Sequence, residues 1–262
     1  MRRHLAIAAL AAALAAIAAT AFAASQTGTK DGDKLRGTEQ ADTIDGGAGD
    51  DYIAGLGGDD TLQGGADSDS IDGGAGNDKV YGGGAKYGAT GLGRYVDNPG
   101  KELLLGGDGN DLVLANSCLQ QGCSADRYIA LESTLEGDGG DDVVTGGNLG
   151  DLLLGGPGHD TLTGLGGNDR IDGGDGDDRL DGGAGKDVLR GGAGNDTLDG
   201  GPGNDRLLGG TGKNLLMGGA GNDRITVRDG KRDRVDCGPG KDRVSADKRD
   251  VLRHCERVRR SR

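Results

Sequence analysis

Aspartate recurs at a spacing of nine residues through most of this chain, at the same place in a glycine-rich motif. The longest uninterrupted series contains ten copies and covers residues 137–226. Its sixth-position residues are Asp142, Asp151, Asp160, Asp169, Asp178, Asp187, Asp196, Asp205, Asn214 and Asp223. Carboxylate oxygens are ligands that hard divalent cations prefer, so this spacing indicates a series of metal sites.

Each copy follows the pattern Gly-Gly-x-Gly-x-Asp-x-apolar-x. Glycine at positions 1, 2 and 4 permits the left-handed backbone angles of a tight turn, and the last three residues predict a very short strand with one inward side chain. Turn and strand would make half a coil, so two copies would complete one coil with a strand on each side. The eighth-position residues that would fill the core are Val144, Leu153, Leu162, Ile171, Leu180, Leu189, Leu198, Leu207, Leu216 and Ile225.

Copies two apart would lie on the same edge of such a stack, which places their carboxylates in a ladder with a step of about 4.8 Å. A ladder of like charges is destabilising unless a cation neutralises it. Calcium suits the ladder better than magnesium, because calcium takes about six to eight oxygens in flexible geometry and accepts backbone carbonyls. We therefore expect the mature chain to be largely disordered in a chelator and to fold when calcium is added.

The motif resembles the RTX, or haemolysin-type, calcium-binding nonapeptide repeat. The resemblance implies an all-β fold, the parallel β-roll, a solenoid in which each ion sits between neighbouring turns on one edge. In that family the ions are bound by turn carbonyls and by the sixth-position carboxylates. Carried to this chain, the role of calcium ligand falls on Asp42, Asp51, Asp60, Asp69, Asp78, Asp111, Asp142, Asp151, Asp160, Asp169, Asp178, Asp187, Asp196, Asp205 and Asp223.

Several of these turns depart from the motif, and we expect them to be weak sites. Asn214 lacks a carboxylate, while Leu149 and Asp67 replace the position-4 glycine and would strain their turns. Gln40 and Ala41 alter the turn before Asp42. Two rival interpretations, an EF-hand and a solvated acidic turn without metal, fit less well, because flanking helices are not predicted and the sixth position is kept copy after copy.

The repeat pattern divides the chain into five parts. We assign residues 1–23 to a cleaved secretory signal peptide, 24–81 to an N-terminal cap and first repeat run, 82–136 to an interrupted region with two insertions around one repeat at 106–114, 137–226 to the main ten-copy β-roll, and 227–262 to degenerate repeats in a disulfide-linked basic C-terminal cap.

The first residues predict export. Arg2 and Arg3 precede a run of Ala, Leu and Ile, and residues 21–23 read Ala-Phe-Ala, a cleavage signal. Both the general and the twin-Arg routes fit this leader. No other stretch is apolar enough to span a bilayer, so we expect a secreted, extracellular protein with no membrane span.

The four cysteines agree with an oxidising compartment. Cys237 and Cys255 are 18 residues apart, one full coil of the expected solenoid, which brings them within disulfide reach. Cys118 and Cys123 would close a small loop. Zinc is the rival interpretation, and neither a Cys-x2-Cys spacing nor a paired histidine supports it.

Charge is distributed unevenly along the chain, whose formal net charge is −13. Residues 24–230 carry a net −21, whereas residues 231–262 carry a net +6. So acidic a body repels phosphate, and we expect no nucleic-acid partner. The basic tail could touch an anionic envelope polymer or could be a solvated cap.

The biological role is less specified than the calcium chemistry. We expect a non-enzymatic extracellular scaffold, adhesion or interaction module, because His159 and His254 sit at variable positions and no nucleophile lies in a recognisable elbow. The alternative is a secreted polysaccharide-modifying enzyme, lyase-like or epimerase-like, with a site on the roll surface. Tyr81, Tyr87, Tyr95 and Tyr128 lie in or beside the insertions and could bind a cell-surface glycan or protein, or could merely cover a break in the roll.

Overall fold

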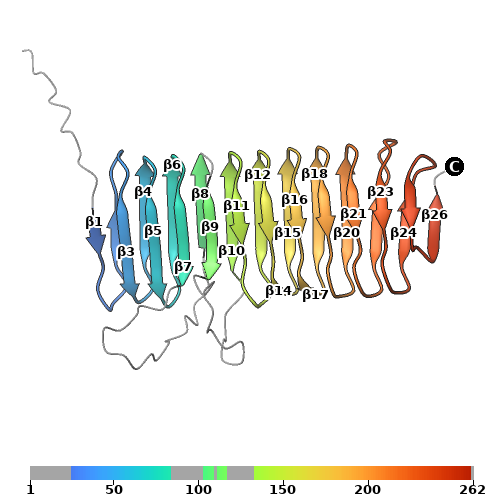
Figure 1. The fold of residues 1–262 in the computed structure, drawn as a ribbon. Helices are drawn as coiled ribbons and strands as arrows, with labels where there is room; N and C mark the ends of the chain where they lie inside the picture. Colours follow the sequence, from blue (N-terminus) through green and yellow to red (C-terminus); the bar gives the residue numbers. More distant parts are fainter. Residues whose placement is uncertain (1–24, 84–102, 109–110, 117–132, 261–262) are drawn as a thin grey trace, which may run out of the picture.

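The computed structural model describes residues 25–83, 103–108, 111–116 and 133–260. These residues form two parallel sheets of twelve strands each, stacked face to face in a long roll (Figure 1). The first sheet contains β1 (Ser25–Thr27), β3 (Thr43–Ala48), β5 (Thr61–Ala66), β7 (Lys79–Gly83), β9 (Leu112–Asn116), β11 (Val143–Thr145), β13 (Thr161–Thr163), β16 (Arg179–Asp181), β19 (Thr197–Asp199), β21 (Leu215–Met217), β23 (Arg234–Asp236) and β25 (Val251–Arg253).

The second sheet contains β2 (Lys34–Arg36), β4 (Tyr52–Gly57), β6 (Ser70–Ala75), β8 (Leu103–Asp108), β10 (Thr134–Gly139), β12 (Leu152–Pro157), β15 (Arg170–Asp175), β18 (Val188–Ala193), β20 (Arg206–Thr211), β22 (Arg224–Val227), β24 (Arg243–Ala246) and β26 (Arg257–Arg260). A further pair, β14 (Gly166–Gly167) and β17 (Ala184–Gly185), hydrogen-bonds within the turns. The described residues contain no helix, and the predicted parallel β-roll is confirmed.

One coil contains two nonapeptides. Leu153 lies beside Ile171 and Ile171 beside Leu189, so equivalent residues of neighbouring coils are 18 apart in sequence. The step becomes 19 where Leu216 pairs with Val235, and 17 where Val235 pairs with Leu252. The strands stay in register through these irregular steps because one residue is gained or lost in a turn rather than in a strand.

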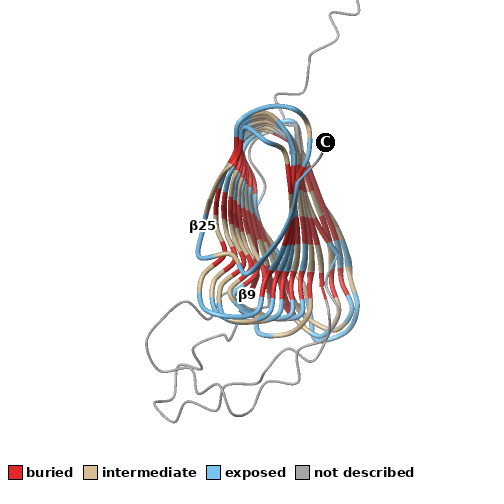
Figure 2. Ribbon diagram, turned by 90° about the vertical axis from the view of Figure 1, so that its right-hand side faces the viewer, coloured by how far each residue is buried: buried red, intermediate tan, exposed pale blue. Residues whose placement is uncertain are grey.

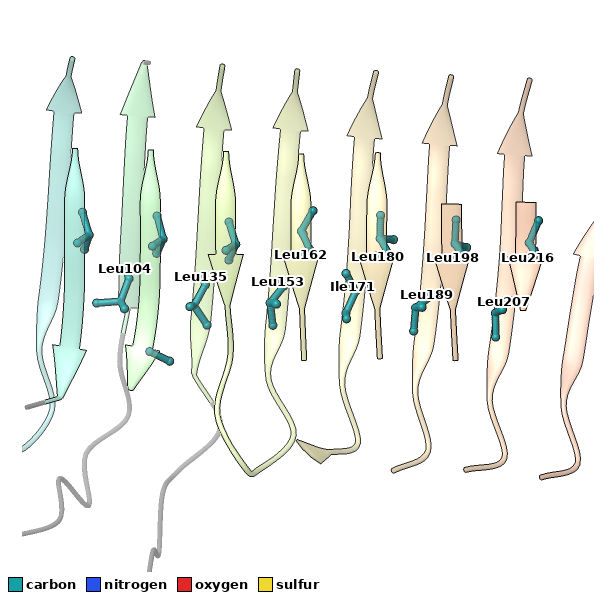
Figure 3. Packing of buried hydrophobic residues seen from close by; sticks show 14 of the residues in the cluster. Leu104, Leu135, Leu153, Leu162, Ile171, Leu180, Leu189, Leu198, Leu207 and Leu216 are labelled. Carbon is teal, nitrogen blue, oxygen red and sulfur yellow. The ribbon is translucent and has the colours of Figure 1, made fainter. Parts of the chain in front are cut away.

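The core is a thin double row of apolar side chains, to which most strands of the two large sheets contribute one at their central position. Leu153, Ile171 and Leu189 form one row, and Leu162 and Leu180 belong to the facing row (Figure 3). Viewed along the stack, the buried residues form two walls that face each other, with exposed residues at the turns (Figure 2). All ten eighth-position residues of the long series are at most 2% exposed, as the sequence predicts.

The two insertions do not interrupt either sheet. Strand β8 pairs with both β6 and β10, and β9 pairs with both β7 and β11, although the register steps are 33 and 31 residues instead of 18. Strand β8 begins at Leu103 and β10 at Thr134, so the roll resumes inside the segments that sequence analysis gave to the insertions. The core therefore continues through Leu104, Val113 and Leu135.

Both insertions enter the roll at the same edge. The segments 84–102 and 117–132 lie outside the described residues, and they link β7 to β8 and β9 to β10. Each therefore leads from the first sheet to the second. We call the turns in this direction the insertion edge, and the turns from the second sheet to the first, such as the one between β8 and β9, the continuous edge.

Candidate metal centres in the turns

The sixth-position aspartates are buried inside the turns rather than displayed on their surface. Those predicted as ligands are at most 5% exposed. Except at Asp42 and Asp151, the Oδ1 atom of each accepts a hydrogen bond from the backbone N–H of the aspartate one coil earlier. The donor–acceptor distance is 2.9 Å from Asp160 to Asp178 and 3.1 Å from Asp178 to Asp196. The expected ladder of carboxylates therefore exists, and a backbone N–H group bridges successive carboxylates.

On the continuous edge this hydrogen-bonded ladder runs without a break through Asp42, Asp60, Asp78, Asp111, Asp142, Asp160, Asp178 and Asp196. On the insertion edge it runs from Asp33 through Asp51 to Asp69, and then from Asp151 through Asp169, Asp187, Asp205 and Asp223 to Asp242. Between these two runs, the residue that donates its N–H to Asp151 is Ser133, at 2.8 Å.

The second carboxylate oxygen faces the space that the position-1 glycine leaves open. A Cβ atom at Gly182 would lie 2.7 Å from Oδ2 of Asp187 and 2.9 Å from the carbonyl oxygen of Gly200 in the next coil. At Gly155 a Cβ atom would likewise overlap Oδ2 of Asp160 and the carbonyl oxygen of the following coil. A carboxylate oxygen and a carbonyl oxygen from adjacent coils therefore converge where any other residue would place a side chain. We call this space beside the position-1 glycine the glycine cradle.

Most of these Oδ2 atoms are buried and accept no hydrogen bond from a described residue. They belong to Asp51, Asp60, Asp78, Asp142, Asp160, Asp169, Asp178, Asp187, Asp196, Asp205 and Asp223. A buried carboxylate oxygen without a partner costs free energy on the order of 1–3 kcal/mol or more. A bound cation would supply the missing partner, so the donor set fits a metal ion.

The nature of the donors selects among cations. No group of three or more His, Cys, Asp or Glu side chains in the described ranges comes together as a metal site. Any ion must therefore take much of its coordination from backbone carbonyls, which the glycine turns of adjacent coils present. Hard oxygen ligands of this kind, in a stack that imposes no octahedral geometry, suit calcium.

Burial makes these carboxylates hard to ionise without a cation. Desolvation raises the pKa of Asp169 and that of Asp142 to about 7, and it raises the pKa of Asp160 to about 6. The backbone N–H bond to each carboxylate lowers its pKa, and the neighbouring carboxylates raise it again. The ionised ladder is therefore electrostatically unfavourable by itself, and a divalent cation would reverse the balance.

In three degenerate turns the Oδ2 atom accepts a backbone N–H of its own turn, and we call these closed turns. Oδ2 of Asp33 accepts the N–H of Thr29 at 2.6 Å. Oδ2 of Asp42 accepts the N–H of Thr38 at 2.5 Å, and Oδ2 of Asp151 accepts that of Gly147 at 2.7 Å. The turns of Asp42 and Asp151 are among those expected to be weak, since they contain Gln40, Ala41 and Leu149. Their Oδ2 atoms still lie beside the position-1 glycine, but each already accepts a backbone N–H of its own turn.

Asp67 shows the other response to a missing position-4 glycine. It adopts the expected left-handed conformation with φ 79°, so this turn keeps the shape of the motif at the cost of strain. Leu149 is not among the residues with positive φ in the described ranges. One substitution therefore strains its turn, while the other reshapes it.

The Asn214 turn differs in two ways at once. Oδ1 of Asn214 accepts the N–H of Asp196 at 2.8 Å, so the backbone ladder is kept. A Cβ at Gly209, however, would meet Nδ2 of Asn214 at 3.0 Å and a methyl group of Val227 at 3.2 Å, in place of carboxylate and carbonyl oxygens. An amide and a methyl group fill this cradle, which makes it a poor cation site.

Two similar aspartates are absent from the predicted ligand set. Asp233 and Asp242 are buried, and Oδ2 of each accepts no hydrogen bond from a described residue. Burial raises the pKa of Asp233 to about 6. Their signal was the weak repeat echo that pairs them with Val235 and Val244. Their turns start with Val227 and Cys237 instead of glycine, and both of these side chains are buried in the core.

The described cysteines and histidines make contacts that link neighbouring coils. A disulfide joins Cys237 to Cys255 with a Cα–Cα distance of 5.2 Å, as their spacing predicts, and it links the last coils. His159 is exposed and its Nδ1 accepts the N–H of Asp177 at 2.8 Å. His254 is exposed and its Nδ1 lies 2.7 Å from Oδ1 of Asp236.

Some predicted features fall outside the described residues. They are the leader at 1–23, the pair Cys118 and Cys123, and the tyrosines Tyr87, Tyr95 and Tyr128. In the part of the chain that is described, no helix has the length and apolarity needed to cross a bilayer.

Comparison with protein-family models matched the RTX calcium-binding nonapeptide repeat at residues 27–62, 54–85, 97–117, 133–153, 145–180, 154–189, 172–207, 181–216, 190–225 and 208–231. The matched segments together cover more than half of the chain. The chain belongs to this family. A search of curated proteins found no match.

RTX nonapeptide repeats bind calcium, so the match indicates a calcium-binding repeat protein. The RTX match at 97–117 falls between the two insertions, where β8 and β9 continue the sheets. The match ends at residue 231. It therefore stops close to the point where position 1 changes from glycine to Val227 and Cys237.

Proposed function

We propose that this protein is exported and that calcium folds it into a rigid, non-enzymatic scaffold for extracellular adhesion or interaction. The observation that carries the proposal is the repeated convergence of a buried Oδ2 atom and a carbonyl oxygen in the glycine cradle. Without a cation, this crowding of buried oxygen atoms is unfavourable. A divalent cation between the coils would make it favourable. Calcium availability would then decide whether the stack forms.

The ligand set follows from the turn geometry. The open turns would hold calcium through Asp51, Asp60, Asp69, Asp78, Asp111, Asp142, Asp160, Asp169, Asp178, Asp187, Asp196, Asp205 and Asp223. Asp42 and Asp151 would contribute weakly, because their Oδ2 atoms already accept an N–H of their own turn. Bound calcium would supply the positive charge that balances the buried carboxylates.

Two further observations support an extracellular scaffold. The Cys237–Cys255 disulfide is typical of an oxidising compartment, which agrees with the Arg2, Arg3 and Ala21–Ala23 leader signals. The surface histidines, His159 and His254, each contact a neighbouring aspartate or its backbone and not a nucleophilic side chain. A long rigid roll with insertions at one edge is suited to present those insertions to a glycan or protein partner.

A calcium titration of the mature chain tests the proposal. Calorimetry would give the number of ions, circular dichroism the β content, and hydrodynamic radius the compactness, each with and without chelator. We expect large gains of β signal and compactness on adding calcium, and loss of both on chelation. Full β signal and compactness in chelator would show that the fold does not depend on calcium and would refute the proposal.

A further inference from the structure

The C-terminal end of the roll reverses the charge of the rest of the molecule. Residues 206–262 contain 16 Lys and Arg against 8 Asp and Glu, a net charge of +8. Residues 1–205 carry the remaining net charge of −21. Several of the C-terminal acidic groups, such as Asp223, Asp233 and Asp242, are buried in turns, so the positive charge dominates the outer surface there.

Four arginines on this end stand in register on one face. Arg206 of β20 pairs with Arg224 of β22, Arg224 pairs with Arg243 of β24, and Arg243 pairs with Arg257 of β26. All four are exposed on the outer face of the second sheet. Parallel neighbours in a sheet are about 4.8 Å apart, so these side chains form a straight row along the roll axis. We call this row the arginine ladder.

The arginine ladder lies in a shallow groove. Thr226, Ser245 and Arg259 line the groove beside it and add hydroxyl donors and a fifth guanidinium. In the described ranges, no aromatic side chain lines this groove. The groove therefore offers hydrogen-bond donors and positive charge, with little surface for stacking.

The arginine ladder has no anionic partner among the described residues. None of the four side chains forms an ion pair there, whereas Arg190, farther back on the same sheet, lies 3.9 Å from Asp172. Like charges placed directly opposite on neighbouring strands destabilise a sheet. Four in succession are unfavourable unless a ligand with regularly spaced negative charge neutralises them.

We propose that the arginine ladder binds a linear acidic polysaccharide whose sugars carry carboxylates. This inference rests on the proposed function, since it names the partner of the calcium-folded scaffold. Guanidinium groups match carboxylates in planar, two-point hydrogen bonds. The regular spacing of the ladder lets several carboxylates of one extended chain meet arginines of different strands.

Nucleic acid fits the same groove less well. Proteins that bind single strands stack the bases on aromatic side chains, and the lining of the groove has none. The observations therefore favour carboxylated sugars over phosphates.

The test measures binding of short oligogalacturonates to the mature chain in a fixed calcium concentration, after circular dichroism has shown the β fold. Dextran oligomers serve as the neutral probe and oligothymidylate as the phosphate probe. The ladder variant is R224Q/R243Q. Its matched control is R170Q/R179Q, which removes the same charge from exposed seventh-position arginines of β15 and β16 outside the ladder.

We expect the ladder variant to weaken oligogalacturonate binding about tenfold or more and to reduce its salt dependence, while the control variant changes it about twofold or less. Equal losses in both variants, or no oligogalacturonate binding by the folded wild type, would overturn the inference alone. Tighter binding of oligothymidylate than of oligogalacturonate would also overturn it. Absence of β signal in calcium would instead refute the proposed function, and the inference with it, because the ladder needs the sheet.

Discussion

The two edges of the roll use the same nonapeptide but differ in continuity. On the continuous edge, backbone N–H groups and carboxylates link every coil from Asp42 to Asp196. On the insertion edge, the described aspartate ladder forms two runs, one that includes Asp69 and one that begins at Asp151, whose Oδ1 atom accepts the N–H of Ser133 instead of that of another aspartate. The sheets and the core nevertheless pass through this region without a break.

The difference shows that the strands can keep the sheets and the core continuous even where a turn is replaced. A turn at one edge can be replaced by a long insertion, provided that the strands on both sides return to register and the inward side chains, such as Leu104 and Leu135, keep stacking. The turns of the continuous edge then have to stabilise the coils in the middle of the roll. We therefore expect Asp78, Asp111 and Asp142, which face the insertions across the roll, to matter more than their counterparts in regular coils.

Lowering the pH should have the largest effect, because it acts on carboxylates of both edges together. The pKa of Asp142 on the continuous edge and that of Asp169 on the insertion edge are raised to about 7 by burial. Without calcium the folded state therefore binds more protons than the unfolded chain between about pH 4 and 7, so its stability rises as the pH falls through that window.

We expect β signal and compactness in chelator to recover between pH 7.5 and about pH 5, and the calcium affinity at each edge to fall over the same range as protons compete. Circular dichroism in chelator and calcium titration at each pH would measure both effects. If the chain in chelator becomes less ordered as the pH falls, burial does not raise the pKa of these carboxylates in the folded state.

Single substitutions can compare the edges directly. Asp142→Ala removes an acceptor of the Asp111 N–H, at 2.7 Å, where the insertion edge offers Ser133 instead of a carboxylate. Asp187→Ala removes the equivalent bond in a regular coil with aspartates at both edges. We expect both to destabilise the calcium-bound protein, Asp187→Ala by about 1–2 kcal/mol and Asp142→Ala by about 2–3 kcal/mol.

Denaturant unfolding in saturating calcium measures this difference, and calorimetry counts the ions lost by each variant. If Asp187→Ala costs as much as Asp142→Ala or more, the continuous edge has no special role opposite the insertions. Loss of ions by neither variant would mean that the ladder serves only the backbone.

The Asn214 turn allows the continuous edge to be extended. Asn214→Asp alone should add little affinity, because Val227 occupies the cradle beside Gly209. The pair Asn214→Asp and Val227→Gly should create one further calcium site, worth about 1.4 kcal/mol at tenfold excess of calcium over its Kd.

In chelator the same Asn214→Asp change should be destabilising, because it introduces another buried carboxylate. The control is Val227→Gly alone, which empties the cradle and adds no ligand. Calorimetric stoichiometry decides the outcome. An unchanged ion count in the double variant would show that the side chains filling the cradle are not what prevents calcium binding in this turn.

The smallest effect should come from the closed turn of Asp151 on the insertion edge. Leu149→Gly restores the position-4 glycine and should release Oδ2 of Asp151 from the N–H of Gly147. We expect a gain of about one weakly bound calcium and less than about 1 kcal/mol in stability. Leu165→Gly, at a position-2 residue that already has φ 72°, is the matched control and should leave the ion count unchanged.

Much of the fold could be predicted because the repeat is local. Glycine spacing determines where the chain can turn, and the single apolar residue at position 8 determines which way each strand faces, so the core from Val144 to Ile225 was predicted residue by residue. The spacing of Cys237 and Cys255 predicted the disulfide for the same reason, since one coil is two periods. These inferences need only near neighbours in sequence.

The candidate sites were predicted less completely. The sequence indicated which aspartates matter, but it did not show that Oδ1 is taken by a backbone N–H of the previous coil and that only Oδ2 faces the cradle. It marked the turns of Asp42 and Asp151 as weak but did not show that their Oδ2 atoms accept an N–H of their own turn, and it did not include Asp233 and Asp242. Both distinctions depend on hydrogen bonds within and between coils.

By itself, the sequence determined the period, the inward side chains and the chemistry of the turns, because each is a property of nine consecutive residues. Tertiary structure alone decided which residues of different coils lie side by side. Arg206, Arg224, Arg243 and Arg257 are separated by 18, 19 and 14 residues, yet they form one row, because residues gained or lost in turns are absorbed there while the strands stay paired. Stacking against neighbouring coils sets that register, and no local pattern can reveal it.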